Sequence, residues 1–140
     1  MTESTGAGVE REVRATRPRI LIVDDDAPLA RSLATMIGAA GAYETRIVHC
    51  AADAVAVTAE FPPAIVFLDI ELPDMSGYEV AQLLNQRAQL QATRLIALTD
   101  SNEHPAREDA RAAGFERYLV KPVTEIELRK VLHRMTTIAS

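Results

Sequence analysis

The chain has 140 residues, which suits one domain of ordinary size and leaves no room for two independent cores. Hydrophobic residues make up 48% and charged residues 25%, which excludes a fully disordered chain, and the net charge of -5 argues against a uniformly basic, nucleic-acid-binding surface. Cys50 is the only cysteine, which excludes an internal disulfide and a thiolate metal cluster, and the lack of a long apolar segment or signal peptide predicts a cytoplasmic protein with no membrane partner.

Residues 1–18 differ in composition from the rest of the chain. They are polar, include two glycines and end at Pro18. This composition predicts a flexible N-terminal tail, with a docking arm as the alternative. We therefore expect the folded domain to span residues 19–140.

From residue 19 onward the sequence alternates between two patterns. Short, continuous runs of β-branched and large apolar residues predict strands that are buried on both faces of a parallel sheet. Longer stretches with apolar residues three and four positions apart predict helices. In chain order, the predicted elements are strand 20–23, helix 28–40, strand 46–48, helix 52–60, strand 64–68, helix 76–88, strand 95–98, helix 105–113, strand 118–120 and helix 124–137.

The predicted helices carry capping and packing signals. Ser76 and Thr124 are candidate N-caps, and Gly114 is a candidate C-terminal cap. The side chains expected on the buried helix faces are Leu29, Leu33, Met36, Ile37 and Ala40; Ala52, Val55, Ala56 and Ala59; Val80, Leu83 and Leu84; and Ile126, Leu128, Val131, Leu132 and Met135. Five strand–helix units with right-handed crossovers predict helices on both faces of one five-stranded parallel sheet.

Polar side chains follow four of the five predicted strands. The first strand runs into Asp24, Asp25 and Asp26, and Asp69, Thr99 and Lys121 follow the third, fourth and fifth strands. The carboxyl ends of parallel strands share one edge of the sheet, where ligands bind in such folds, so we expect these side chains to meet there. The second strand ends in His49 and Cys50, to which we assign no role.

The three adjacent aspartates are the clearest chemical signal. One of them can serve as a helix cap or turn residue, but three neighbouring carboxylates repel one another, and a divalent cation would offset that repulsion. We predict Asp24 and Asp25 as metal ligands and Asp26 as a cap or solvent-facing residue. Asp69 ends the most hydrophobic run, well before the next helix starts near Ser76, so we predict a functional carboxylate and not a cap.

Thr99 and Lys121 are weaker signals when taken alone. Threonine is a common strand residue, and the alternative for Lys121 is an ordinary surface lysine. Pro122 holds Lys121 in an extended conformation at the end of a buried run, which favours a functional position; the bond between them can be cis or trans.

Four motifs and the spacing between them resemble the receiver domain of bacterial two-component response regulators. The motifs are ILIVDDD, VFLDIELPDMSGYEV, LIALT and GFERYLVKP, and the resemblance covers about residues 19–136. It implies a flavodoxin-like α/β fold, a doubly wound five-stranded parallel sheet in the order 2-1-3-4-5 with five helices. The simplest relative of this kind is the chemotaxis response regulator.

The resemblance also implies a mechanism. Asp69 would accept a phosphoryl group from a phosphohistidine of a sensor histidine kinase. Mg²⁺ (or Mn²⁺) would be held by Asp24, Asp25, Asp69 and the backbone carbonyl of Glu71. Thr99 and Lys121 would contact the phosphoryl group, Tyr118 would act as a rotamer switch, and Pro73 and Gly77 would shape the loop after the third strand.

Output is expected through the face formed by the fourth helix, the fifth strand and the fifth helix, toward a downstream protein or a phosphotransfer protein and not toward nucleic acid. Because the chain ends soon after the last predicted helix, we expect a stand-alone receiver that is a switch and not an enzyme. A phosphorelay shuttle or a phosphate sink of a hybrid kinase system is the alternative.

One departure from the family pattern concerns the residue after Thr99, which is usually small and here is Asp100. A carboxylate at this position, together with Ser101 and the side chain of Glu71, is expected to tune the lifetime of the phosphorylated form. Two remote alternatives use similar parts: a haloacid-dehalogenase-like phosphatase, whose nucleophile would come before the acidic pair, and a flavin-binding protein, whose first loop would be rich in Ser, Thr and Gly instead of Asp.

Overall fold

Five parallel strands form one sheet in the order β2-β1-β3-β4-β5. The structure is a computed structural model that describes residues 17–100 and 111–139, without the side chains of residues 88 and 136–139. Strand order reverses between β1 and β3, which places their carboxyl ends at the point where ligands bind in open α/β sheets. The strands are β1 (Arg19–Val23), β2 (Glu44–Val48), β3 (Ile65–Asp69), β4 (Arg94–Thr99) and β5 (Phe115–Val120).

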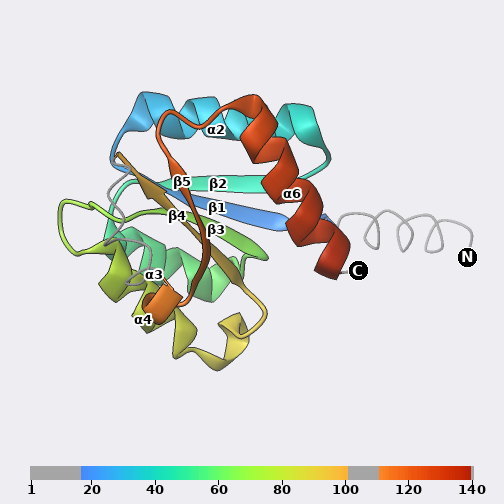
Figure 1. Cartoon of the computed structure of the whole chain (residues 1–140). Helices are drawn as coiled ribbons and strands as arrows, with labels where there is room; N and C mark the ends of the chain where they lie inside the picture. The colour runs from blue at the N-terminus through green and yellow to red at the C-terminus, as the bar shows by residue number, and fades with distance from the viewer. Residues whose placement is uncertain (1–16, 101–110, 140) are drawn as a thin grey trace, which may run out of the picture.

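Helices cover both faces of this sheet (Figure 1). On one face lie α2 (Ala27–Ala40) and α6 (Glu125–Ala139); on the other lie α3 (Ala51–Glu60) and α4 (Gly77–Asn85), followed by the short 3-10 turn η1 (Ala88–Leu90). The helix predicted at 105–113 lies outside the described residues except for 111–113, which are helical. The fold class and strand order predicted from the sequence are confirmed.

The sheet separates two hydrophobic clusters, which explains why the strands are continuously apolar. Alternate side chains of a strand point to opposite faces. On β1, Ile20 and Ile22 pack in the cluster with α2 and α6, whereas Leu21 and Val23 pack in the cluster with α3 and α4. Every β3 residue is buried, so the central strand has no solvent-facing side.

The predicted helix caps are present where the structure describes them. The Ser76 hydroxyl accepts a hydrogen bond from the Tyr78 N–H (3.2 Å). The Thr124 hydroxyl accepts one from the Glu127 N–H (3.2 Å), and the Glu127 carboxylate accepts one in return from the Thr124 N–H (3.4 Å), which is a capping box. Gly114 has a φ of 104°, the left-handed region that favours glycine after a helix.

Three predictions of buried helix faces are wrong. In α3 the buried residues are Ala51, Ala54 and Thr58, because an alanine-rich stretch gives no periodic signal strong enough to choose a face. Ile126 of α6 is 68% exposed, since it is two positions from buried Leu128 and two positions turn a helix almost halfway round. Leu83 is one position from buried Leu84, about 100° away around the helix, and is 39% exposed. Ala52, Ala56 and Ala59 are exposed and Val55 is half-buried.

The start of α4 is pressed against the end of β3. A methyl group on Gly77 would overlap the carbonyl oxygen of Asp69 and the Cα of Ile70, whereas one on Gly38, inside α2, would meet nothing. We expect Gly77→Ala to lower the free energy of unfolding by about 1–3 kcal/mol through overpacking. The matched variant Gly38→Ala should raise it by about 0.5–1 kcal/mol through helix propensity. Urea unfolding of both variants measures the difference, and a Gly77→Ala protein as stable as wild type would contradict the close packing.

No helix within the described part of the chain is long and apolar enough to cross a membrane.

Candidate functional site

The three residues that follow β1 are aspartates, and two of them, Asp24 and Asp25, lie near Asp69. We call Asp24, Asp25 and Asp69 the acidic cluster. Asp24 is fully buried, and its backbone N–H donates to the carbonyl of Val48 on β2 (3.1 Å). Asp25 is exposed. Asp26 is the N-cap of α2, with its carboxylate accepting from the Leu29 N–H (3.1 Å), as predicted for one of the three aspartates. Each aspartate therefore has a different environment, although the three are adjacent in sequence.

Asp69 is the last residue of β3 and is 3% exposed. Its Oδ1 accepts a hydrogen bond from the Glu71 N–H (2.9 Å), which fixes the orientation of the carboxylate. Ligand oxygens of Asp24, Asp25 and Asp69 lie within 4.8 Å of one another. The adjacent carboxyl ends of β1 and β3 thus bring together carboxylates that are far apart in the sequence.

Lys121 supplies the positive charge of the site. Its Nζ lies 2.8 Å from Asp24 Oδ2, 3.3 Å from Asp69 Oδ2 and 4.0 Å from Asp100 Oδ1. The residue is held at the edge by its own N–H, which donates to the Thr99 carbonyl (2.7 Å) at the end of β4, and the bond to Pro122 is cis. The Lys121 side chain is only 8% exposed, so the surface-lysine alternative does not describe it.

Burial and neighbouring charges together shift two pKa values at the site. Burial, reinforced by the charge of Asp24, raises the pKa of Asp69 from 3.8 to about 6, against the opposing effects of the Glu71 N–H and Lys121. Burial alone would lower the pKa of Lys121, but the carboxylates of Asp24 and Asp69 outweigh it and leave that pKa raised. The ammonium therefore stays charged at neutral pH, whereas Asp69 ionises less readily than an ordinary aspartate.

The cluster fits a hard divalent cation. Its donors are carboxylate oxygens, which Mg²⁺ prefers, and three carboxylates around one ammonium leave a negative excess. Asp24 Oδ2 is buried and lies 2.8 Å from the Lys121 ammonium. A carboxylate oxygen has more than one acceptor position, so it can pair with the ammonium and still serve as a metal ligand.

The remaining predicted site residues lie around this cluster. Thr99 ends β4 beside β3 and is 3% exposed. Glu71 and Asp100 are exposed, and Ser101 lies outside the described residues. Tyr118 is half-buried on β5, opposite Ala97, and packs against the cluster of α3 and α4. The structure thus places the described candidates at or near the same edge.

Two side chains at this edge were missed by sequence reasoning. His49, to which no role was assigned, has its Nδ1 2.9 Å from the carbonyl oxygen of Asp24. Asp74, which was not singled out, accepts hydrogen bonds from the backbone of α3. The start of α3 could have indicated Asp74. Cys50 is a poor capping residue, so the first N–H groups of this helix need an acceptor from another part of the chain.

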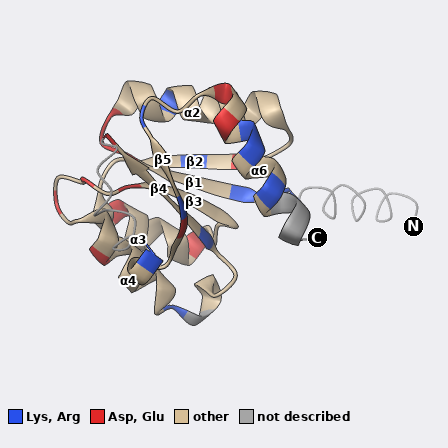
Figure 2. Ribbon diagram, viewed as in Figure 1, with Lys and Arg blue, Asp and Glu red and all other residues tan. Residues whose placement is uncertain are grey.

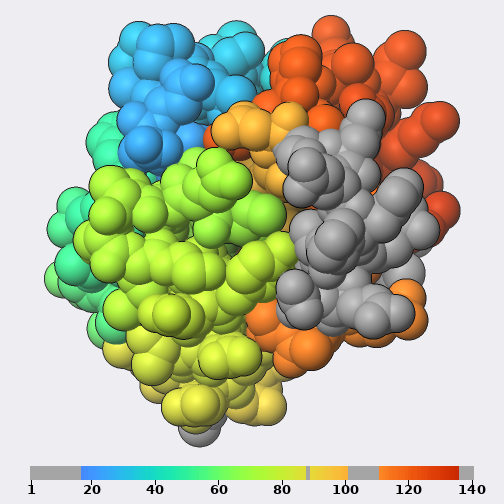
Figure 3. Space-filling model, turned by 60° about the vertical axis from the view of Figure 1, so that its left-hand side comes forward, coloured from blue at the N-terminus to red at the C-terminus, as the bar shows by residue number. Residues whose placement is uncertain are grey.

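Several acidic residues lie at the carboxyl edge of the sheet, whereas α6 carries both acidic and basic residues and a further basic residue lies on α2 (Figure 2). Seen from the carboxyl edge, the segments that follow β1, β3 and β4 lie side by side, in blue, green and amber (Figure 3). The site is therefore an acidic surface with one buried ammonium beneath it.

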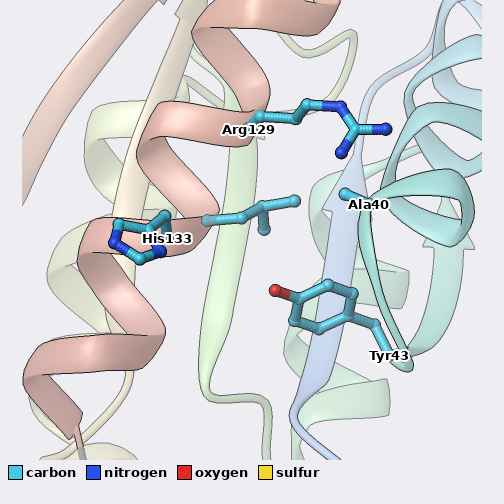
Figure 4. A pocket seen from close by; sticks show the side chains of 5 residues that line it. Ala40, Tyr43, Arg129 and His133 are labelled. Carbon is cyan, nitrogen blue, oxygen red and sulfur yellow. The ribbon is translucent and has the colours of Figure 1, made fainter.

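A separate hollow of about 300 Å³ lies between the end of α2 and the middle of α6 (Figure 4). None of its lining residues belongs to the acidic cluster. Arg129 reaches across from α6, donating to the Ala39 carbonyl (3.3 Å) and to Glu125 (3.0 Å), so it satisfies a carbonyl of the last turn of α2. The hollow is lined by Ala40, Tyr43, Arg129, Leu132 and His133.

Comparisons with known proteins agree with this geometry. The DNA-binding response regulator MtrA of Mycobacterium tuberculosis (strain ATCC 25618 / H37Rv) is 32% identical over 112 residues, 80% of this chain and 47% of MtrA, so the chain spans about half the length of this relative. Protein PilG of Pseudomonas aeruginosa is 26% identical over 110 residues, 79% of this chain and 81% of PilG.

A solved CheY-like response regulator receiver domain protein from Methanospirillum hungatei superimposes with a TM-score of 0.78 at 27% identity, covering 87% of this chain and 96% of that structure. The family model described as the response regulator receiver domain matches residues 20–133. The chain belongs to the response regulator receiver domain family.

Proposed function

We propose that this chain is a phosphorylation switch in which Asp69 accepts a phosphoryl group from a phosphohistidine of a sensor histidine kinase. The observation that carries the proposal is the meeting of Asp24, Asp25 and Asp69 within 4.8 Å, with the Lys121 ammonium 3.3 Å from Asp69. A bond forms between an Asp69 carboxylate oxygen and phosphorus while the phosphorus–nitrogen bond of the donor breaks. Hydrolysis of the aspartyl phosphate resets the switch.

The residues of the site divide the work of this transfer. Phosphoryl transfer depends mainly on positioning and on neutralising charge. The Glu71 N–H orients the Asp69 carboxylate, and Lys121 neutralises charge on one side of the incoming group. Asp24, Asp25, Asp69 and the Glu71 carbonyl would hold Mg²⁺ or Mn²⁺, which supplies further charge neutralisation. Thr99, at the end of β4, would bind the phosphoryl group.

The output surface in this proposal is the face of β5 and α6 together with the helix before β5. Thr99 would move toward the phosphoryl group, and half-buried Tyr118 would turn inward as a rotamer switch. Because such a change is a population shift, the unphosphorylated protein would already visit the active form. The partner is a downstream protein or a phosphotransfer protein and not nucleic acid; "DNA-binding" in the name of MtrA describes that longer relative.

Asp100 bears on the lifetime of the phosphorylated state. Its carboxylate is 67% exposed and its Oδ1 lies 4.0 Å from Lys121 Nζ, so it competes with the phosphoryl group for the same ammonium. Glu71 adds a second exposed carboxylate near the opening. A short-lived phosphoryl group would suit the alternative role as a phosphorelay shuttle or phosphate sink. In either role we place the protein in the cytoplasm with its kinase, as a switch and not as an enzyme that acts on other substrates.

With Mg²⁺ present, acetyl phosphate should add one phosphoryl group to the wild-type chain and none to Asp69→Asn, because only the carboxylate is a nucleophile for this transfer. Intact-mass spectrometry reads the product directly. Asp53→Asn, which changes an exposed carboxylate in α3, is the matched control and should be labelled like wild type. Labelling of Asp69→Asn to the wild-type extent would refute the proposal.

A further inference from the structure

The first residues of α3 have an unusual source of capping. The N-cap residue Cys50 is extended (φ -148°, ψ 165°), and its side chain makes no capping hydrogen bond. The first N–H groups of a helix lack partners within the helix and need an acceptor from outside. Asp74 provides it, with Oδ1 accepting from the Ala51 N–H (2.9 Å) and Oδ2 from the Ala52 N–H (3.0 Å).

Asp74 belongs to the loop between β3 and α4, which also carries Glu71. The base of this loop is tightly closed: Glu71 and Ser76 form an antiparallel bridge, and the Gly77 N–H donates to the Ile70 carbonyl (3.0 Å). The backbone of Gly77 touches that of Asp69 and leaves no room for a side chain. The loop is therefore anchored to Asp69 at its base and to α3 through Asp74.

The residues just before α3, at the end of β2, contact the segment that carries Asp24 and Asp25. The Asp24 N–H donates to the Val48 carbonyl (3.1 Å), and His49 Nδ1 lies 2.9 Å from the Asp24 carbonyl oxygen. A carbonyl only accepts, so His49 donates through an Nδ1–H. Residues 48–52 are thus hydrogen-bonded on one side to the segment of Asp24 and on the other to the loop that follows Asp69.

We propose that Asp74 and His49 are positioning residues, which fix the separation between Asp24 with Asp25 and Asp69 with Glu71 by hydrogen-bonding both segments to residues 48–52, where β2 leads into α3. The inference rests on the proposed Mg²⁺-dependent function of that site. Three ties span 22 to 25 residues of sequence, and each ends on the backbone, so they hold the two segments without using the ligand oxygens. Partners that orient metal ligands typically change metal affinity by about 10- to 100-fold when they are removed.

The first test is the Mg²⁺ affinity of Asp74→Ala, measured by isothermal titration calorimetry on the metal-free full chain. We expect the dissociation constant to rise by about tenfold or more, because the loop with Glu71 loses its anchor on α3. The control Asp53→Ala removes an exposed carboxylate from the first turn of α3 that joins no two segments within the described part of the chain, and it should bind Mg²⁺ like wild type. Wild-type affinity in Asp74→Ala would overturn the proposal.

A second variant separates positioning from simple helix capping. Cys50→Ser supplies a local N-cap for α3, so in the Asp74→Ala background it should recover thermal stability. If Asp74 is a positioning residue, the Mg²⁺ affinity of this double variant stays about tenfold or more below wild type. Recovery of both stability and Mg²⁺ affinity would show that Asp74 only caps α3 and would overturn the proposal. The double variant also keeps the test usable if Asp74→Ala alone fails to fold.

His49 is tested by a conservative pair. In His49→Asn the side-chain amide offers a donor near the position of Nδ1 and should retain Mg²⁺ affinity, whereas His49→Ala should lose it. Equal affinities for wild type and His49→Ala would remove His49 from the proposal.

The wild-type chain distinguishes failure of the proposed function from failure of the positioning proposal. A wild type that neither binds Mg²⁺ nor is labelled at Asp69 fails the proposed function, whereas a labelled wild type with unchanged Asp74→Ala and His49→Ala affinities fails the positioning proposal alone.

Discussion

In the absence of metal, Asp69→Asn should be more stable than wild type at about pH 8, and the difference should nearly vanish at about pH 4. The cause is the pKa of Asp69, which burial raises from 3.8 to about 6. A raised carboxyl pKa means that the folded protein favours the neutral form. The stability that this group contributes is present below its unfolded pKa and is lost as the pH rises through its folded pKa.

The asparagine side chain cannot ionise, so it avoids this loss. A pKa raised from 3.8 to about 6 corresponds to roughly 3 kcal/mol, a figure that already includes the favourable contact with Lys121. We expect a gain of about 2 kcal/mol, because solvent at the edge of the site screens part of the effect. The amide oxygen can still accept from the Glu71 N–H. Urea unfolding across this pH range, in the presence of a chelator, measures the effect. A stability difference that does not change with pH would contradict the raised pKa as its cause.

Lys121→Met should destabilise the metal-free protein by about 3–5 kcal/mol at about pH 8, since it leaves buried carboxylates without their counter-charge. Asp24 is fully buried and Asp69 nearly so, and Lys121 Nζ lies within 3.3 Å of an oxygen of each. Thermal and urea unfolding measure the loss. Mg²⁺ should recover part of it, because a cation that binds the folded cluster stabilises it by linkage.

The chain offers a matched control, because its only other lysine is Lys130, which is exposed on α6. Lys130→Met should change stability by no more than about 0.5 kcal/mol. Adding Asp69→Asn to Lys121→Met should restore part of the lost stability, because it removes one of the two buried carboxylates left without a counter-charge. If Lys121→Met and Lys130→Met unfold alike, the ammonium is not balancing the buried carboxylates.

The sequence predicted the sheet, and the edge at which the candidate site residues meet, because both depend on local composition. Strands buried on two faces are apolar throughout, and the polar residue that ends each run then marks the edge where Asp69, Thr99 and Lys121 come together. The first helix after the acidic cluster was also clear, since Asp26 caps it.

The parts that could not be predicted depend on contacts between distant segments. The hydrogen bonds of Asp74 and His49 join residues 22 to 25 positions apart, so no local sequence pattern indicates them. The prediction of the buried face of α3 was wrong for a related reason. Alanine is small enough to lie on either side of a helix, and packing against the sheet decides which alanines are buried. Ile126 shows the converse case, a large apolar residue left exposed by the phase of its helix.

The carboxylates of Asp24, Asp25 and Asp69 concentrate negative charge at one edge of the described sheet, which the net charge of -5 alone does not reveal. The field of such a local concentration steers an approaching protein, so a partner with a positive surface would meet the edge of Asp25 and Asp69 more often than chance orientation allows. Dissolved salt screens this attraction at separations beyond about 8 Å at physiological ionic strength. A phosphoryl group on Asp69 would add negative charge to the edge that is already negative and strengthen the steering further.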